Sequence, residues 1–212
     1  MKAIIAFGES NIPLRRLCDA LWPDEQGDAA QRSLEVTLHR LRKILGHEHA
    51  VIIEDRLLSL NPELVWTDVS ALELIPTPEI GAGELPEDAL REVRHMLGLY
   101  KGSFLPGDTE ASWTVSRRER VRARVARIVE VMGQNCEVAG DWETALQWYR
   151  KGIEADDLAE TFYQGSIRCL TQTGRRAEAM ALFRRLRQTL SVTLGVPPSE
   201  KSDSLYQSLL AN

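Results

Sequence analysis

A repeat near the C-terminal end of the chain restricts the possible folds more than any other feature. Six residues recur after thirty-four positions, with small, apolar, aromatic and basic side chains in the same order. They are Gly140, Ala145, Leu146, Trp148, Tyr149 and Arg150, matched by Gly174, Ala179, Met180, Leu182, Phe183 and Arg184. Glycine suits a turn, alanine suits a close approach between helices, and the aromatic residue fills the gap to the next unit. The pattern predicts stacked pairs of antiparallel helices.

A period of thirty-four residues is that of tetratricopeptide repeats. Helices are also expected at 87–100 and 111–139, and Pro197-Pro198-Ser199 precedes a last helix at 200–210 that would cap the repeats. The aromatic residues at repeat positions are interpreted as core, with a concave groove for a partner helix or peptide as the alternative. They are Trp142, Trp148, Tyr149, Phe162, Tyr163 and Phe183.

The stretch 28–46 predicts one long helix with a marked beginning and end. Asp28 is the expected N-cap, and Gly46 suits the left-handed turn that ends a helix. An apolar face is formed by Leu34, Leu38, Leu41 and Leu45. The opposite face carries Arg32, Val36, His39, Arg40 and Lys43, while Arg42 lies to one side and is interpreted as structural. Such a helix fits the major groove of DNA, although many globular helices with this pattern bind no nucleic acid.

The flanking segments place this helix third in a series. A helix at 1–7 ends at Gly8, a turn follows at 9–13, and a second helix covers 13–21. After the long helix, two short apolar runs around Asp55-Arg56 predict a β-hairpin over 51–60, and 65–69 predicts a further strand. Three helices followed by a hairpin are typical of a winged helix-turn-helix, with 29–45 as its recognition helix.

Basic residues outside the long helix allow two interpretations. Arg56, at the tip of the hairpin, is a candidate contact to the minor groove or the DNA backbone, or else a solvated turn residue. Arg15 and Arg16 either touch phosphate or are solvated. The densest basic run, 116–127, splits its arginines between the two flanks of an apolar face. We interpret it as structural, with arginines that pack along the helix and pair with carboxylates.

Residues 76–86 form the stretch most typical of a linker, because they hold three prolines and two glycines. The sequence therefore predicts a mainly α protein in three parts. Residues 1–75 form a truncated winged helix-turn-helix domain, 76–86 a linker, and 87–212 an all-α, tetratricopeptide-like repeat domain.

Charge and cysteine content limit the possible partners. The net charge of −5 provides no global attraction to nucleic acid, and the first fifty residues hold seven Lys or Arg against seven Asp or Glu. Any DNA contact must therefore come from a local patch. Three scattered cysteines argue against a disulfide framework and favour a reducing, cytoplasmic location. No run is long enough to cross a membrane, so no membrane partner is expected.

An enzyme is not expected. His47 and His49 flank Glu48, but no further ligand follows at metal-site spacing, so a turn is the better interpretation. No glycine-rich phosphate loop or nucleophile elbow is present in the sequence. The sequence predicts neither catalysis nor a cofactor.

Several motifs, in order along almost the whole chain, resemble those of SARP-type bacterial transcriptional regulators. The first group resembles their winged helix: Leu21-Trp22-Pro23-Asp24, Asp28-Ala29-Ala30, Leu38-His39-Arg40-Leu41-Arg42-Lys43 and Leu45-Gly46. The second resembles their bacterial transcriptional activator domain: 99–107, Trp113, Arg117-Arg118-Glu119-Arg120 and 194–199.

The resemblance implies a DNA-reading winged helix of the response-regulator type followed by an all-helical domain. In that type a small antiparallel sheet precedes the first helix, whereas this sequence begins inside that helix. Two explanations stay open: the chain is a fragment of a longer regulator, or the natural protein lacks the sheet.

Two functions follow from these observations. The first is a DNA-binding transcriptional activator, or the output part of one, that reads double-stranded promoter DNA with helix 29–45. Its repeats would contact RNA polymerase or another regulator copy. The second is a protein–protein interaction module whose degenerate winged helix does not bind DNA.

Overall fold

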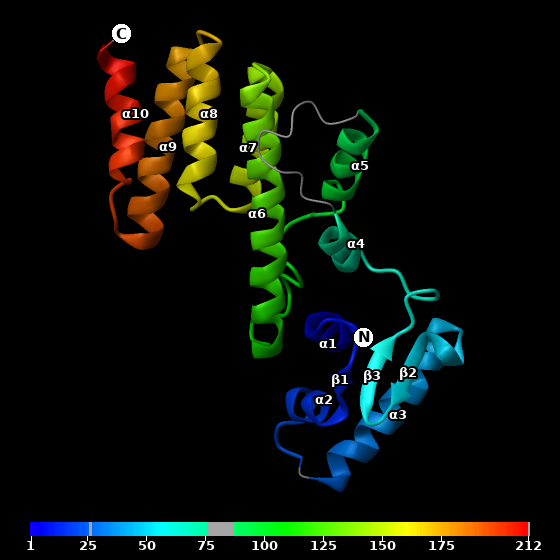
Figure 1. The fold of residues 1–212 in the computed structure, drawn as a ribbon. Coiled ribbons are helices and arrows are strands. Elements are labelled where there is room, and N and C mark those ends of the chain that lie inside the picture. The colour runs from blue at the N-terminus through cyan, green and yellow to red at the C-terminus, as the bar shows by residue number, and fades with distance from the viewer. Residues whose placement is uncertain (26, 76–86, 212) are drawn as a thin grey trace. The chain divides into compact units, whose positions relative to one another are not determined.

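The computed structural model describes residues 1–25, 27–75 and 87–211. The chain divides into two compact units, one formed by Met1–Leu74 and Ser103–Val121, the other by Ile75–Gly102 and Arg122–Asn212 (Figure 1). The predicted fold class, mainly α with a winged helix-turn-helix and tetratricopeptide-like helices, is confirmed. The predicted linker, 76–86, lies outside the described residues.

The first unit begins with three helices: α1 (Lys2–Phe7), α2 (Leu14–Leu21) and α3 (Asp28–Leu45). Gly8 and Gly46 end α1 and α3 with φ of 107° and 74°, in the left-handed region that glycine adopts without a steric cost. Both ends agree with the prediction from sequence.

The predicted N-cap of α3 is wrong. Gly27, with φ of 55°, holds the N-cap position, and Asp28 is the first helical residue with no side-chain cap bond. Asp28 still places its carboxylate in the first turn, where the helix dipole favours negative charge. The positive φ at Gly27 explains the shift by one residue, since an L-residue at that position would be strained.

The first unit contains one three-stranded antiparallel sheet in the order β1-β3-β2. After the 3-10 turn η1 (Glu48–Ala50), β2 (Val51–Glu54) and β3 (Leu57–Leu60) form the predicted hairpin. The strand predicted at 65–69 is wrong. The third strand is β1 (Ile12–Pro13), inside the segment predicted as a turn, and Ile12 pairs with Leu58. Proline fits there because β1 is an edge strand and needs no N–H on its outer side.

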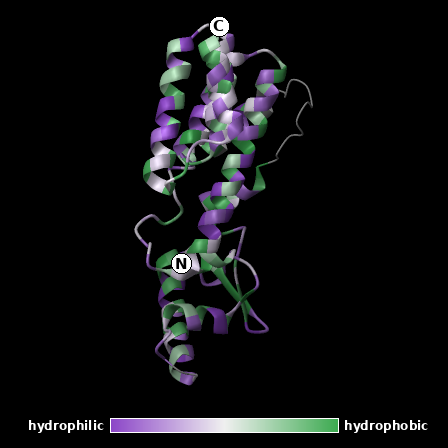
Figure 2. Cartoon of the chain, turned by 90° about the vertical axis from the view of Figure 1, so that its left-hand side faces the viewer, coloured by the Kyte–Doolittle hydropathy of each residue, from purple (hydrophilic) through white to green (hydrophobic). Residues whose placement is uncertain are grey.

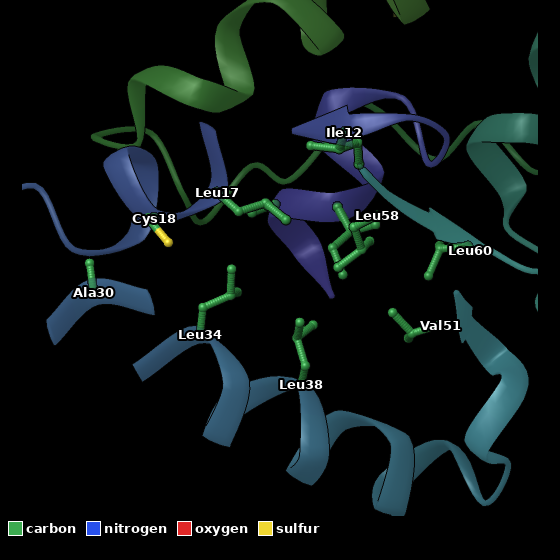
Figure 3. Close-up of a cluster of buried hydrophobic side chains, with 11 residues drawn as sticks. Ile12, Leu17, Cys18, Ala30, Leu34, Leu38, Val51, Leu58 and Leu60 are labelled. Atoms are coloured by element: carbon green, nitrogen blue, oxygen red, sulfur yellow. The ribbon is translucent and has the colours of Figure 1, made fainter. Parts of the chain in front are cut away.

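An apolar core joins the helices to the sheet. Leu34 and Leu38 point from α3 into a cluster that receives Leu17 from α2 and Leu58 from β3 (Figure 3). Leu58 is fully buried, and the other three are at most 4% exposed. The leucine face predicted from sequence therefore fixes α3 by one side only, and the other side faces solvent.

Residues 103–121 complete the first unit. This segment includes η2 (Ser112–Thr114) and the first residues of α6 (Val115–Val138). Trp113 packs against the core cluster, and Lys2 Nζ lies 2.9 Å from Asp108 Oδ2. The sequence places these residues with the repeat domain, whereas their packing partners belong to the winged helix.

Arginines at the start of α6 hold this segment in place. The Arg117 guanidinium is 2% exposed and donates to Glu73 Oε1 at 2.6 Å, on α4 (Asp68–Leu74). Arg118 donates to the carbonyl oxygens of Phe104 and Leu105, each at 3.0 Å. These bonds support the structural interpretation of the arginine-rich run.

In the part of the second unit that the structure describes, the regular elements are all helices joined by short loops. Its helices are α5 (Glu87–Leu97), the remainder of α6, α7 (Trp142–Ala155), α8 (Glu160–Gln172), α9 (Arg176–Leu194) and α10 (Glu200–Ala211). Both hydrophobic and hydrophilic residues occur around these helices (Figure 2).

The predicted repeat is visible in the packing of this unit. Ala145 and Ala179 are fully buried at equivalent positions of α7 and α9, and Tyr149 and Phe183 are each 2% exposed. Phe183 stacks on Tyr206 of α10, with ring centroids 4.2 Å apart. Five of the six aromatic residues are therefore core residues as predicted, namely Trp148, Tyr149, Phe162, Tyr163 and Phe183, whereas Trp142 is only half-buried. Helix α10 covers the last repeat as predicted.

Candidate nucleic-acid interface

The solvent face of α3 is the candidate site. A helix turns about 100° per residue, so Arg32, Val36, His39, Arg40 and Lys43 fall within an arc of roughly 100°. All five are exposed, opposite the buried leucines. The core fixes the direction of this face, since Leu34 and Leu38 bind the helix to the first unit from behind.

The cations of this face are available to a ligand. Arg32 donates from Nε to the carbonyl oxygen of Asp28 at 3.1 Å, which leaves its terminal nitrogens available. Among the residues that the structure describes, Arg40 and Lys43 form no ion pair and no side-chain hydrogen bond. Val36 adds an apolar spot that is 51% exposed. The face combines hydrogen-bond donors with one methyl-bearing contact, as base edges in a major groove require.

Arg42 has the structural role expected of it. Its Nε and Nη2 both donate to the carbonyl oxygen of Val51, at 3.2 Å and 2.9 Å. The bond ties the C-terminal end of α3 to the first residue of β2. The position of Arg42 beside the basic face predicted a structural role. The position did not predict the hydrogen-bond acceptor, which lies nine residues later on β2.

The hairpin tip carries Arg56 in a constrained conformation. Asp55 and Arg56 have φ of 48° and 63°, as in a type I′ turn, and both are exposed. The Arg56 carbonyl oxygen accepts the Leu14 N–H at 3.0 Å, which fixes the tip against the start of α2. Its side chain lines a groove of about 830 Å³ together with Asp28 and Gln31 at the start of α3.

The surroundings of Arg56 are mixed in charge. The same groove is lined by the carboxylates of Asp19, Glu25, Asp28 and Asp55 and by Arg15. The guanidinium of Arg15 lies 3.9 Å from Asp19, and that of Arg16 lies over the Phe7 ring at 4.3 Å. The structure therefore groups Arg56 with the beginning of α3, while Lys43 lies in its last turn.

A second groove, of about 900 Å³, lies at the C-terminal end of α3. It is lined by His39, Arg42, Lys43, His47 and His49, with β2 beside them. The sequence predicts that His47 and His49 lie in a turn. In the structure, His47 is the N-cap of η1, and His49 lies within η1. The local sequence holds no signal for this groove, because it forms only when β2 returns beside α3.

Other kinds of site find no support in the described residues. No group of three or more His, Cys, Asp or Glu in this part of the chain is arranged to hold a metal ion. Among the helices that the structure describes, none combines the length and the apolar character needed to span a bilayer.

The family follows from comparison with known proteins. Residues 79–210, more than half of the chain, match the bacterial transcriptional activator domain. The chain belongs to this family. Membership confirms the resemblance to SARP-type regulators and supports a role of the chain in bacterial transcription regulation.

Two similar proteins extend the likeness beyond that domain. Regulatory protein AfsR of Streptomyces griseus is 26% identical over 203 residues, which cover 92% of this chain and 20% of AfsR. The structure of Mycobacterium tuberculosis EmbR in complex with a low affinity phosphopeptide matches with a TM-score of 0.64 at 17% identity. That match covers 95% of this chain and 55% of EmbR, so the fold of both units is shared. The chain spans a fifth of AfsR.

Proposed function

We propose that this chain is a DNA-binding transcriptional activator, or the output part of one, that acts in the cytoplasm. The exposed cationic face of α3 carries the proposal, because its opposite face is fixed in the core and its cations are available. In a winged helix, the third helix is the element that enters the major groove.

Each residue of the face has a role under this proposal. The guanidinium groups of Arg32 and Arg40 suit bidentate bonds to guanine, and Val36 suits contact with a thymine methyl group. His39 donates or accepts at a base edge. Lys43, in the last turn of α3, contacts phosphate and so positions the helix without reading sequence. Arg56 contacts the DNA backbone or minor groove from the hairpin.

Selection from a randomised pool of DNA duplexes tests the base-reading role. The full chain should enrich a defined sequence, and replacing Arg40 with Ala should weaken binding to it by about 1–3 kcal/mol. The triple variant Arg32→Ala/Arg40→Ala/Lys43→Ala should enrich none. Arg187→Ala is a matched control, since Arg187 is an exposed arginine of α9 in the other unit.

If the triple variant binds the enriched duplex as tightly as the wild type, the assignment of α3 as the DNA-reading helix is refuted. Circular dichroism must show that each variant is folded. The salt dependence of binding adds a second check, because phosphate contacts make affinity fall steeply as salt rises.

We also propose that the repeats contact a protein. A groove of about 430 Å³ runs between α7 and α9, lined by Arg150, Ile153, Glu154, Leu182 and Arg185, among others. Apolar residues flanked by both charges suit a peptide or helix of a partner. RNA polymerase and a second regulator copy are the partners proposed for an activator. EmbR, which shares this fold, was solved with a phosphopeptide.

The alternative function is an interaction module without DNA binding. The four carboxylates around Arg56 favour it, since they oppose phosphate at the hairpin tip. Pull-down of RNA polymerase by the full chain, lost on Leu182→Asp and kept by the α3 triple variant, would support a repeat-mediated contact. Enrichment of a DNA sequence by the same protein would exclude the module as the whole function.

A further inference from the structure

The groove at the C-terminal end of α3 has the chemistry of an anion site. Its described lining includes five side chains with N–H donors, which are His39, Arg42, Lys43, His47 and His49. Glu48 is the one carboxylate among the described lining residues. The carbonyl end of α3 contributes negative charge, but the partial charge of a helix end is about half a unit. Arg42 and Lys43 outweigh it.

The Arg42 guanidinium is immobilised and still has unused hydrogen-bond donors. Two of its five N–H groups are used by the Val51 carbonyl oxygen, so the guanidinium plane is fixed and three donors remain. An arginine that is already immobilised loses less conformational entropy when it binds an anion. The contact that makes Arg42 structural therefore also prepares it for binding.

His47 is oriented by its own backbone turn. The Nδ1 atom of His47 accepts the backbone N–H of His49 at 3.3 Å. A neutral imidazole that accepts at Nδ1 carries its proton on Nε2, so His47 presents an Nε2–H donor. The His49 ring lies beside it, with centroids 5.8 Å apart.

The same groove is poorly suited to an added β-strand. β2 is an edge strand, and an added strand would need its outward carbonyl oxygens. Arg42 already occupies the Val51 carbonyl oxygen. Backbone groups point alternately toward and away from the partner strand in an antiparallel pair. After Val51, the next residue of β2 whose backbone N–H and carbonyl oxygen point away from β3 is Ile53. One free position gives little for a strand to pair with.

His39 and Lys43 belong both to this groove and to the exposed cationic face of α3. A duplex whose major groove receives α3 must carry a sugar–phosphate strand along one flank of the helix. We infer that this groove binds the phosphate backbone of that strand, with Arg42, His47 and His49 as contacts additional to Lys43. The inference rests on the proposed DNA binding and names residues that position the helix without specifying sequence.

Salt titration of DNA binding separates such contacts from base contacts. The probes are a fluorescein-labelled duplex of mixed sequence and the duplex enriched by selection, each measured with the full chain by anisotropy. Arg42→Gln keeps an amide donor for Val51 but removes the charge. It should lower the slope of log affinity against log salt by about 0.9, the value for one lost phosphate contact. Arg187→Gln on α9 should leave the slope unchanged.

The double variant His47→Gln/His49→Gln tests the groove without touching the Val51 bond. It should weaken binding by about 2- to 10-fold, as expected for lost neutral hydrogen bonds. The loss should be equal on the two duplexes. His95→Gln, an exposed histidine of α5, is its control.

Three outcomes overturn the inference. The first is a salt slope for folded Arg42→Gln that equals that of the wild type. The second is normal DNA binding by the histidine variant, and the third is a loss of affinity that appears only on the enriched duplex. If Arg42→Gln does not fold, the histidine variant decides alone. If the groove variants bind DNA normally while Arg32→Ala/Arg40→Ala loses binding, the inference about the groove is rejected and the proposed function stands. A wild-type chain that binds neither duplex rejects both.

Discussion

Arg56 has an unfavourable backbone conformation at the tip of the hairpin. Its φ of 63° costs an L-residue about 1–2 kcal/mol, and glycine would avoid this cost. Strain of this kind persists where the side chain has a use. Under the proposed function, this unfavourable backbone is kept because it presents a guanidinium at the tip of the hairpin.

We predict that Arg56→Gly stabilises the protein and weakens DNA binding. Relief of the left-handed strain is offset in part by the greater freedom of glycine in the unfolded chain. The net gain is therefore about 0.5–1 kcal/mol. Urea denaturation and anisotropy on the same samples measure both effects. A variant that is less stable, or that binds as well as the wild type, contradicts this account of Arg56.

Tyr149 shows how closely the repeats are packed. A Cβ added at Gly133 of α6 or at Gly165 of α8 would lie 2.6 Å or 2.5 Å from its ring. The Tyr149 hydroxyl donates to Glu137 Oε1 at 2.5 Å, and Arg168 binds both oxygens of that carboxylate. Burial, with the bond to Glu137, raises the pKa of Tyr149 above its ordinary value.

We predict that Gly165→Ala destabilises the repeats, although alanine favours a helix by about 1 kcal/mol. Overpacking against a buried ring costs about 1–3 kcal/mol, which equals or exceeds that gain. Gly107→Ala is the control, because nothing lies within 4 Å of its added Cβ. Thermal denaturation should show a lower Tm for the first variant only. An unchanged Tm for Gly165→Ala would mean that Tyr149 can move aside.

Glu160 fastens the turn before α10. Burial raises the pKa of its carboxyl group, but bonds from the Ser202 hydroxyl and from the Ser199 N–H and hydroxyl outweigh burial, and the pKa is lowered below 4.5. A lowered folded-state pKa stabilises the fold above the unfolded value. This stability is lost as the pH falls through the folded value.

We predict that Glu160→Gln removes this pH dependence. The difference in unfolding free energy between wild type and variant should be full near neutral pH. It should shrink as the pH drops below 4.5 and vanish below the folded pKa. Urea denaturation across this range measures it. A difference that is constant with pH would show that the carboxylate charge contributes nothing.

At the scale of elements, the segment 103–121 matters most. It follows α5 in sequence, yet Trp113 packs on the winged-helix core and Arg117 is buried against Glu73. The winged helix is therefore completed by residues that come from beyond the predicted linker.

We predict that Trp113→Ala destabilises the first unit by about 2 kcal/mol, less than the 3–5 typical of a fully buried tryptophan because its side chain is half-buried. Hydrogen exchange should become faster in α3 while α8 and α9 keep their protection. Equal acceleration in both units would mean that Trp113 does not act locally.

Elements with a periodic pattern were predictable from the sequence. The hairpin has two apolar runs and a two-residue turn, and the repeats have a period and buried alanines. β1 was missed because two residues carry no periodicity, and Pro13 there is typical of a turn. The assignment of 103–121 depends on contacts far apart in sequence, which local patterns do not contain.

The candidate site was predictable in part for the same reason. The face of α3 follows from helical spacing alone, and its residues are exposed as expected. Their contact with DNA stays a prediction. The groove beside Arg42 needs β2, and the carboxylates near Arg56 come from α2, α3 and the hairpin. Sites assembled from several elements are not visible in any one stretch of sequence.

At the scale of the whole molecule, a local patch must act against a net charge of −5. Arg32, Arg40 and Lys43 place three cations on the exposed face of α3, while in the second unit Arg168 pairs with Glu137 and Arg175 with Glu178. Paired charges add little attraction to DNA. The proposed function assigns DNA binding to α3 and protein binding to the repeats.

Hydrogen exchange of the full chain, with and without the duplex enriched by selection, tests this claim most directly. We predict slower exchange in Asp28–Leu45 and at the tip of the hairpin when DNA is added, with α7 and α9 unchanged. Unchanged exchange throughout Asp28–Leu45 at a DNA concentration that saturates binding would contradict it.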